Sequence, residues 1–304
     1  MAKKLSELRT GHAAPRQKKP GNPGGVVLIG APDDRGVFNV GGRIGAATGP
    51  LAARTALDKL MLGPLDKGED ISTCGFLEEA HRRLRAATTG ALKSGQTPIV
   101  IGGGHDYGYP HIGGMADAFG VSKIGLINID AHLDVRETTG GVITSGSPYF
   151  LALEEGCLQG PHFVEFGIQP HCNKADRFAY LKSRKARVLM LGDARGGAGG
   201  IINSFRRELK KLLAKKLKVA VSVDLDAVAN AYAPGVSAPQ ADGLTPAELF
   251  AIMEECGTSA GVVSLGFFEL APPLDRDDMT ARLCATAIHR FVCAIPNRPA
   301  SKRR

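Results

Sequence analysis

The sequence predicts an α/β protein of three layers, in which helices cover both faces of a central, mostly parallel β-sheet. Three observations lead to this fold class. Short apolar runs recur along the 304 residues, amphipathic stretches separate them, and several runs end in acidic or imidazole side chains. Strands that alternate with helices favour a parallel sheet that is buried on both faces. Ligands of such sheets bind beyond the carboxyl ends of the strands.

Seven strands are expected, because each of seven short runs is rich in β-branched or other apolar residues. In chain order, the expected strands are Val26–Gly30, Pro98–Ile101, Ile124–Asp130, Phe163–Gly167, Arg187–Leu191, Val219–Leu225 and Val262–Phe267.

Helices are expected where apolar residues recur with helical spacing between polar ones. The longest such stretches are Ala80–Lys93, Ile201–Lys216, Pro246–Cys256 and Asp278–Phe291. A shorter helix is expected near residues 147–156, and Ser145 could cap it.

We predict one catalytic domain, residues 26–297, between two basic tails. Residues 1–25 carry a net charge of +5 and residues 298–304 a net charge of +4, which leaves −1 for the body of a chain whose total is +8. The N-terminal tail combines these charges with proline and glycine and cannot bury enough apolar surface to order itself, so we expect it to be disordered. No linker or internal repeat in the middle of the chain indicates a second domain.

The composition argues against several classes of protein. No apolar stretch approaches the roughly 20 residues that span a bilayer, and residues 1–25 lack the apolar centre of a secretory signal. The six cysteines show no CxxC spacing, so neither a zinc knuckle nor a disulfide framework is indicated, and we expect a cytoplasmic protein. Because the positive charge lies in the tails, we do not expect nucleic acid as a partner.

The third expected strand carries the first sign of a metal site. Asp130, His132 and Asp134 stand at alternate positions where this strand ends, and alternate residues of an extended chain share one face. Buried carboxylates must be paired or bound to a cation. A metal ion would therefore compensate the charge of these side chains.

Two further strands end in side chains of the same kind. The run at 219–225 contains Asp224 and Asp226, again two residues apart, and the run at 98–101 leads through three glycines to His105. The glycines would let the backbone pass close to whatever His105 binds. Oxygen-rich ligation without thiolates points to Mn²⁺ rather than zinc. We predict two Mn²⁺ ions per subunit.

Four segments, in order, resemble the signature segments of the ureohydrolase (arginase) family. They are GGGHD at 102–106, NIDAHLDVR at 128–136, SVDLD at 222–226 and FFELAP at 267–272, and the similarity covers about residues 26–292. The resemblance implies an arginase-like fold, a homo-oligomer, and a hydrolase that acts on the C–N bonds of linear amidines.

The resemblance also implies how two metal ions would share the ligands. One ion would be bound by His105, Asp130, Asp134 and Asp226, and the other by His132, Asp130, Asp224 and Asp226. Asp130 and Asp226 would then bridge the two ions.

Two residues are predicted to carry catalysis. Paired divalent cations lower the pKa of a shared water enough to supply hydroxide near neutral pH, and the hydroxide would attack the amidinium carbon of the substrate. Asp134 is placed to take the proton and pass it to the departing amine. By the resemblance, Glu269 would hold the N–C–N group, since a carboxylate accepts two parallel N–H donors. Asp106 could orient His105 or serve only as a turn residue.

Departures from the wider family indicate the substrate. Arg136 stands where arginases typically have asparagine, and SGSPY at 145–149 replaces the arginase SGNxHG, so that Tyr149 takes the place of a histidine thought to shuttle protons. These segments, with AYAPGVSAP at 231–239 and FGIQPHCN at 166–173, resemble the formimidoylglutamase branch of the family. We therefore expect N-formimino-L-glutamate to be cleaved to L-glutamate and formamide, as in histidine degradation.

The expected substrate contacts are Arg136, Ser145, Ser147, Tyr149 and Glu269. Arg136 could bind a glutamate carboxylate in a bidentate manner, or it could pair with a neighbouring carboxylate of the protein.

Three alternatives remain open at this stage. The substrate could be arginine, agmatine or another guanidino compound, with urea as a product. The chain could be a deacetylase with one zinc ion, although such a site needs only one Asp-His-Asp set. Lastly, the body could be an inactive scaffold whose basic tails bind nucleic acid.

Overall fold

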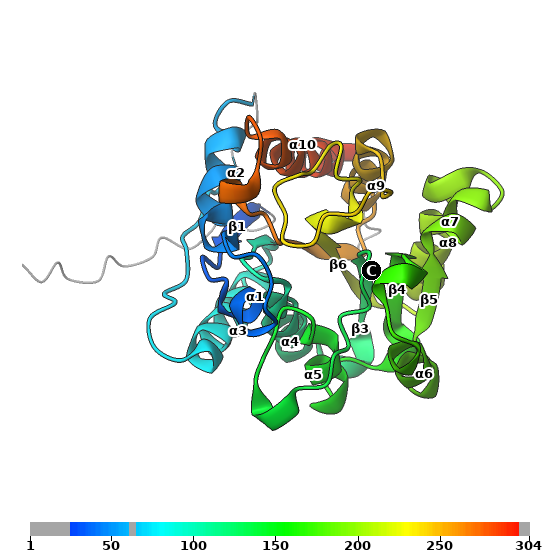
Figure 1. The fold of residues 1–304 in the computed structure, drawn as a ribbon. Coiled ribbons are helices and arrows are strands. Elements are labelled where there is room, and N and C mark those ends of the chain that lie inside the picture. Colours follow the sequence, from blue (N-terminus) through cyan, green and yellow to red (C-terminus); the bar gives the residue numbers. More distant parts are fainter. Residues whose placement is uncertain (1–24, 61–64, 298–304) are drawn as a thin grey trace, which may run out of the picture.

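A computed structural model describes residues 25–60 and 65–297, which form a seven-stranded sheet flanked by helices (Figure 1). The strand order is β1-β2-β7-β6-β3-β4-β5, and every neighbouring pair is parallel. The strands are β1 Val26–Gly30, β2 Thr97–Ile101, β3 Ile124–Ile129, β4 Phe163–Ile168, β5 Arg187–Met190, β6 Lys218–Asp224 and β7 Val262–Phe268. All seven predicted strands are present, with ends that differ by at most one residue.

The α-helices cover both faces of the sheet. They are α1 Arg35–Asn39, α2 Gly49–Leu57, α3 Leu77–Lys93, α4 Gly108–Phe119, α5 Pro148–Glu154, α6 Ala175–Ser183, α7 Leu191–Gly196, α8 Gly200–Ala214, α9 Pro246–Thr258 and α10 Met279–Ala294. Figure 1 shows α2, α9 and α10 on one side of the sheet and α3, α4 and α5 on the other. The predicted three-layer fold class is confirmed.

Strand β1 illustrates why the sheet needs two helical layers. Val26 and Leu28 pack into the cluster that includes α2, α9 and α10, whereas Val27 and Ile29 pack into the cluster that includes α3. Alternate residues of a strand point to opposite faces, so a run in which every residue is apolar must be covered on both sides.

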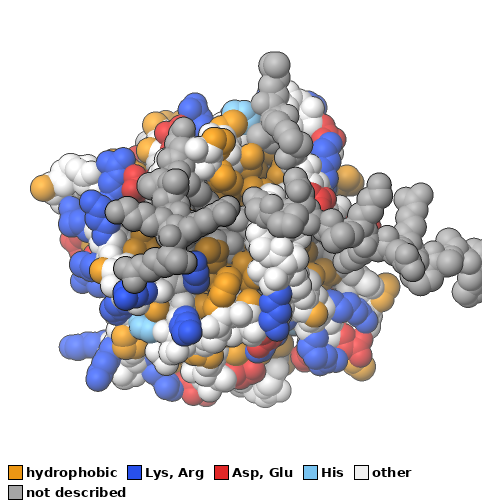
Figure 2. Space-filling model, turned by 180° about the vertical axis from the view of Figure 1, so that it is seen from behind, with side chains coloured by type: hydrophobic (Ala, Val, Ile, Leu, Met, Phe, Trp, Pro, Cys, Tyr) orange, Lys and Arg blue, Asp and Glu red, His pale blue; other side chains and the backbone are white. Residues whose placement is uncertain are grey.

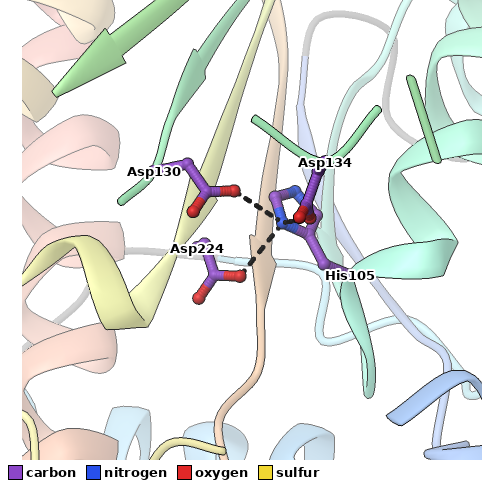
Figure 3. Close-up of side chains that lie close together, drawn as sticks. All are labelled: His105, Asp130, Asp134 and Asp224. Carbon is purple, nitrogen blue, oxygen red and sulfur yellow. Dashed lines mark hydrogen bonds and ion pairs between the residues drawn. The ribbon is translucent and has the colours of Figure 1, made fainter. Parts of the chain in front are cut away.

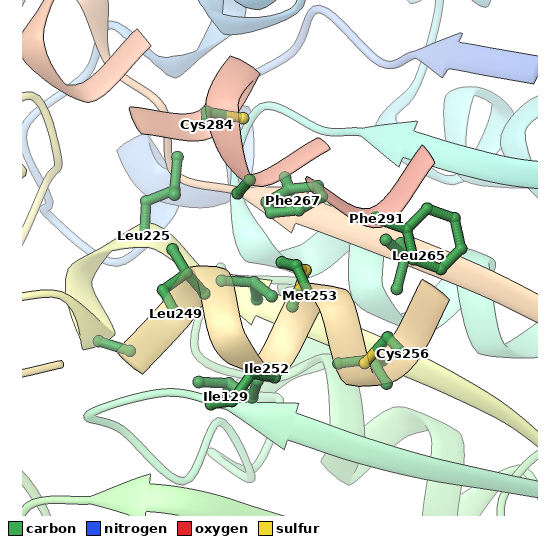
Figure 4. Close-up of a cluster of buried hydrophobic side chains, with 14 of the residues drawn as sticks. Ile129, Leu225, Leu249, Ile252, Met253, Cys256, Leu265, Phe267, Cys284 and Phe291 are labelled. Atoms are coloured by element: carbon green, nitrogen blue, oxygen red, sulfur yellow. The ribbon is translucent and has the colours of Figure 1, made fainter. Parts of the chain in front are cut away.

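Helix α9 shows the local rules that fix a covering helix. It begins with a capping box, in which the Glu248 N–H donates to Thr245 Oγ1 (3.3 Å) and the Thr245 N–H donates to Glu248 Oε2 (2.8 Å). Its apolar face then packs onto Phe267 of β7 and Phe291 of α10 (Figure 4). Capping satisfies N–H groups that have no partner within the helix, and apolar burial supplies most of the stability.

The strand order brings together the segments that carry the predicted site residues. Strands β2, β7, β6 and β3 are consecutive neighbours, so the segments that follow them meet at one edge of the sheet. In the sequence these segments lie between residues 102 and 271, but the register pairs Ile129 with Val223 and Asp224 with Phe268. Residues remote in sequence are thereby brought within contact of one another.

Several predictions concern features outside this edge. None of the described helices is both long and apolar enough to cross a bilayer. The six cysteines are free, and Cys74 and Cys293 are exposed. On the reverse face, Lys and Arg side chains of the described residues are interspersed with Asp and Glu rather than gathered in one patch (Figure 2). The tails predicted for residues 1–25 and 298–304 lie, except for Gly25, outside the described residues.

Candidate metal centre

A cavity of about 350 Å³ opens at the edge where β2, β7, β6 and β3 end. Most of the residues predicted for the site line this cavity. They are His105, His132, Asp134, Arg136, Ser145, Asp224, Asp226 and Glu269. Asp130 lies beneath them and is fully buried.

The first group of side chains surrounds one ring nitrogen of His105. Nδ1 lies 3.1 Å from Asp130 Oδ2, 3.0 Å from Asp134 Oδ2 and 3.0 Å from Asp224 Oδ2. Figure 3 shows the three carboxylates around this nitrogen, those of Asp130 and Asp134 from the segment after β3 and that of Asp224 from the end of β6. One imidazole nitrogen and three carboxylate oxygens within 4.8 Å of one another could hold a metal ion.

The second group shares Asp130 with the first. His132 Nδ1 lies 3.0 Å from Asp226 Oδ2 and 3.6 Å from Asp130 Oδ1. The Asp224 carboxylate lies beside His105 and the Asp226 carboxylate beside His132, whereas the family resemblance implied Asp226 as a ligand of both ions; the sharing of ligands between two ions stays a prediction. The two groups therefore meet at Asp130.

Backbone hydrogen bonds fix the carboxylates of Asp130, which both groups share, and of Asp224, which belongs to the first group. Asp130 Oδ1 accepts from the His132 N–H (2.7 Å), and Asp224 Oδ1 accepts from the Asp226 N–H (2.9 Å). In each case the backbone N–H two residues later binds one oxygen of the aspartate. The other oxygen, Oδ2, then faces Nδ1 of His105. Asp134 has a φ of 46°, a conformation that costs energy for a residue with a side chain.

The electrostatics favour cations between these side chains. Burial, together with the charges of Asp226 and Asp130, raises the pKa of Asp224 well above its usual range. Burial raises the pKa of Asp226 to about 6, and Asp226 Oδ1 is buried without a hydrogen-bond partner. At Asp130, burial also acts to raise the pKa, but hydrogen bonds from His105 and His132 lower it overall. Divalent cations fit this donor set because they would stabilise the charged carboxylates.

Glu269 follows β7 and faces the same cavity. Its Oε1 accepts from the His105 N–H (2.9 Å), while its buried Oε2 has no hydrogen-bond partner among the described residues. Its backbone has a φ of 65° and is held by a hydrogen bond to the Gly103 carbonyl oxygen (2.8 Å). Burial and the nearby charge of Asp224 raise the pKa of Glu269 well above its usual value, so a cationic ligand would stabilise its carboxylate.

The glycine segment that leads to His105 serves a different purpose from the one expected. A β-carbon on Gly103 would lie 1.8 Å from the carbonyl oxygen of Asp33, and one on Gly102 would lie 2.3 Å from the ring of Phe268. The glycines therefore permit close packing against the protein's own backbone and core rather than against a ligand.

Asp106 does not bond to the neighbouring His105. Its Oδ2 lies 2.7 Å from Nε2 of His81, and both residues are buried. The hypothesis that Asp106 orients His105 through a hydrogen bond is therefore wrong, because its carboxylate is engaged on the other side of the loop.

Two predicted substrate contacts lie away from the cavity wall. Ser147 is fully buried, and its hydroxyl exchanges hydrogen bonds with the backbone of Thr144 (2.7 and 2.9 Å). Ser147, not Ser145, holds the N-cap position of α5, without a capping bond from its side chain. Tyr149 is also fully buried, and its hydroxyl lies 3.0 Å from His105 Nε2. Neither residue therefore lines the cavity predicted to hold the substrate: Ser147 bonds to the backbone of the turn before α5, and Tyr149 contacts His105 from the buried side.

A polar network that sequence reasoning missed surrounds Tyr149. Ser222 Oγ lies 2.9 Å from His105 Nε2, the Tyr149 hydroxyl donates to Asn128 Oδ1 (3.2 Å), and Asn128 Nδ2 donates to Glu165 Oε2 (2.9 Å). The available signal was a single polar residue inside each of the apolar strands β3, β6 and β4. Because the hydroxyls of Tyr149 and Ser222 contact Nε2 of His105, the other ring nitrogen, Nδ1, faces the carboxylates.

Replacing Tyr149 with phenylalanine is expected to weaken Mn²⁺ binding by about tenfold, because outer hydrogen bonds orient a ligating imidazole. The ring would keep its contact with Phe163 (centroids 5.0 Å apart), so the fold should be retained. Calorimetric Mn²⁺ titration measures the change. Tyr109→Phe, which removes an exposed hydroxyl bonded to Glu155, is the control. Equal Mn²⁺ affinity in both variants would contradict the expectation.

Known proteins are similar to this chain over most of its length. Residues 24–294 match the sequence model of the Arginase family. The chain is 35% identical over 280 residues to a formimidoylglutamase of Rhodococcus jostii (strain RHA1), covering 89% of this chain and 86% of that protein. It is 29% identical to the mitochondrial guanidino acid hydrolase of Homo sapiens, covering 89% of this chain and 78% of that protein.

Solved structures give the same result. Formiminoglutamase from Trypanosoma cruzi with Mn²⁺₂ matches with a TM-score of 0.83 and 32% identity, covering 91% of this chain and 95% of that one. Formimidoylglutamase from Bacillus subtilis subsp. subtilis str. 168 matches with a TM-score of 0.84 and 25% identity, covering 93% and 90%. With the family matched over almost the whole described chain, the protein belongs to the arginase family.

Proposed function

We propose that this protein is a binuclear manganese hydrolase that cleaves N-formimino-L-glutamate to L-glutamate and formamide. The observation that carries the proposal is the pair of ligand groups that meet at Asp130 beside the unpartnered carboxylate oxygen of Glu269. Support for the substrate comes from the formimidoylglutamases of R. jostii and B. subtilis and from the T. cruzi enzyme, which was solved with two Mn²⁺ ions.

The proposed ligands follow the two groups of side chains. One ion would be held by His105, Asp130, Asp134 and Asp224, and the other by Asp130, His132 and Asp226. When bound, such a pair of ions supplies a strong nucleophile from water at neutral pH and stabilises developing negative charge. A deacetylase site with one zinc ion needs only one Asp-His-Asp set, which the second group supplies, so the additional group around His105 favours the arginase-type reaction.

The chain's own residues would orient the substrate and move one proton. Glu269 would accept N–H bonds from the amidinium group and hold its carbon toward the ligand groups. Asp134, which lines the cavity, would accept a proton from the attacking water and deliver it to the departing nitrogen. The new C–O bond forms as the bond to the glutamate nitrogen breaks, which gives formamide and the free amine of glutamate.

Two cavity-wall residues would bind the rest of the substrate. The Arg136 guanidinium makes no hydrogen bond or ion pair with another described residue, so the proposed role as partner of a substrate carboxylate is favoured over a structural ion pair. Arg136 and Ser145 both line the cavity. An arginine fork binds a carboxylate through two parallel hydrogen bonds.

Product analysis tests the proposal. Mn²⁺-loaded protein is incubated with N-formimino-L-glutamate, L-arginine, agmatine and a guanidino acid in parallel, and products are followed by NMR. Formamide and glutamate in equal amounts, with little urea from the other substrates, are expected. Faster release of urea from arginine, agmatine or the guanidino acid would replace this substrate assignment with the second candidate, for which the human guanidino acid hydrolase is the precedent.

We further propose that the reaction serves histidine degradation in the cytoplasm and that the protein works as a homo-oligomer. The proposal of a cytoplasmic location rests on six cysteines without the spacing of a disulfide framework, and the proposals on histidine degradation and on the homo-oligomer rest on the family resemblance. Light scattering coupled to size-exclusion chromatography measures the oligomeric state, and a monomer at assay concentration would exclude the last of them.

A further inference from the structure

A second cavity of about 360 Å³ adjoins the candidate metal centre. The loop after β3 and the first turn of α6 form its walls, and both Arg136 and Arg177 line it. Arg136 also lines the first cavity, so the two cavities share this residue. The proposed reaction assigns no role to this second cavity.

The two arginines of this cavity differ from most others in the protein. Neither guanidinium makes a hydrogen bond or ion pair with any other residue in the described part of the chain. By contrast, Arg85 is held by Asp117 (2.7 Å) and Arg195 by Asp242 (2.8 Å). Arginine carries five fixed donors, and two such groups without acceptors at one cavity indicate a site for an anion.

The charges within the cavity agree with this interpretation. Burial lowers the pKa of Arg177, and the nearby charge of Arg136 lowers it further. The cavity holds three cationic side chains against two carboxylates, and one carboxylate, that of Asp176, accepts a hydrogen bond from the Arg177 N–H (2.8 Å). A bound carboxylate would relieve the repulsion between the guanidinium groups.

An aromatic wall gives the cavity a fixed shape. The rings of Phe150 and Tyr180 lie 5.4 Å apart, and the Tyr180 hydroxyl donates to Glu154 (2.7 Å). Both rings line the cavity beside the arginines. An apolar wall next to cationic donors suits a carboxylate carried on a short methylene chain.

We propose that Arg177, together with Arg136, forms the subsite for the side-chain carboxylate of the substrate and so selects an acidic amino-acid derivative. This inference rests on the proposed function. With the amidinium at Glu269 and the α-carboxylate near Arg136, the γ-carboxylate lies two bonds farther from the amidine carbon. It would reach past Arg136 into the second cavity, where Arg177 lies.

The kinetic test compares substrates with and without that carboxylate. For N-formimino-L-glutamate, Arg177→Ala is expected to raise KM by about tenfold or more and to leave kcat within about threefold. The reason is that a charge-assisted contact which is equally strong in the bound substrate and in the transition state contributes to KM and not to kcat. KM for N-formimino-L-glutamine, whose side-chain amide is neutral, should stay unchanged. Arg177→Lys keeps the positive charge but not the two parallel donors of the guanidinium, so its KM for N-formimino-L-glutamate should lie between those of the wild type and Arg177→Ala.

Lys182→Ala is the matched control, because Lys182 is an exposed cation on the same helix and lies outside the cavity. A rise in KM no larger in Arg177→Ala than in Lys182→Ala, or an equal rise for both substrates, overturns the proposal.

Direct binding separates this inference from the proposed function. Glutarate is titrated into Mn²⁺-loaded wild type and Arg177→Ala by calorimetry. A loss of affinity of about tenfold in the variant supports the carboxylate subsite even if neither formimino substrate is cleaved, an outcome that would refute the proposed function alone. Equal glutarate affinity in the two proteins refutes the subsite.

Discussion

Replacing Asp130 with asparagine is expected to abolish loading of both metal ions and to lower kcat/KM by about a thousandfold or more, equivalent to about 4 kcal/mol in the barrier. Asp130 is the residue common to both ligand groups, with one oxygen 3.1 Å from His105 Nδ1 and the other 3.6 Å from His132 Nδ1. Asparagine keeps the size of the side chain but removes the negative charge that both cations would share. Elemental analysis and steady-state kinetics measure the two effects.

Asp117→Asn provides the control for this prediction. The Asp117 carboxylate pairs with Arg85 near the surface, so its loss should leave metal content and activity close to those of the wild type. Two equivalents of Mn²⁺ in Asp130→Asn, or near-normal turnover, would exclude Asp130 as a shared ligand.

Replacing Glu269 with glutamine is expected to lower kcat/KM by about 100- to 10,000-fold while the protein still binds two Mn²⁺ ions. The glutamine carbonyl can still accept from the His105 N–H, as Oε1 of Glu269 does, so the loop should hold its position. A neutral amide offers one acceptor and one donor group, whereas an amidinium presents two parallel donors and a positive charge. Activity should therefore fall without loss of metal.

The combination of kinetics and metal content makes the second prediction specific. Glu208→Gln is the matched control, since Glu208 is a buried glutamate that pairs with Lys211 on α8 and does not line the cavity of the candidate metal centre. Loss of Mn²⁺ from Glu269→Gln would reassign Glu269 to metal binding, and wild-type kcat/KM would remove it from the reaction.

The predicted strands were found because their sequence signal is local. In β3 and β6 every residue but the first of β6 is buried, so a continuous apolar run was sufficient to identify them. The exceptions were informative. Asn128 and Ser222 interrupt these runs, and both belong to the network beneath His105. A polar residue in a strand that is buried on both faces needs hydrogen-bond partners. The presence of Asn128 and Ser222 in these strands could therefore have predicted the network.

The positions of Ser147 and Tyr149 could not be predicted in the same way. Both lie in a segment whose sequence is similar to that of the family, and this similarity predicted that the segment lies near the site. Whether a side chain there faces the cavity or the core depends on how the turn before α5 packs, and that packing buries both residues completely. Ser145, two residues earlier than Ser147, lines the cavity instead.

The sequence alone determined which side chains compose the candidate metal centre, because strand geometry places residues two apart on one face and buried carboxylates demand compensation. Only the tertiary structure decided how they are grouped. The strand order β2-β7-β6-β3 and the turn conformations after each strand set Asp224 beside His105 and Asp226 beside His132. Those contacts are long-range, and no local pattern encodes which neighbouring strand a side chain will face.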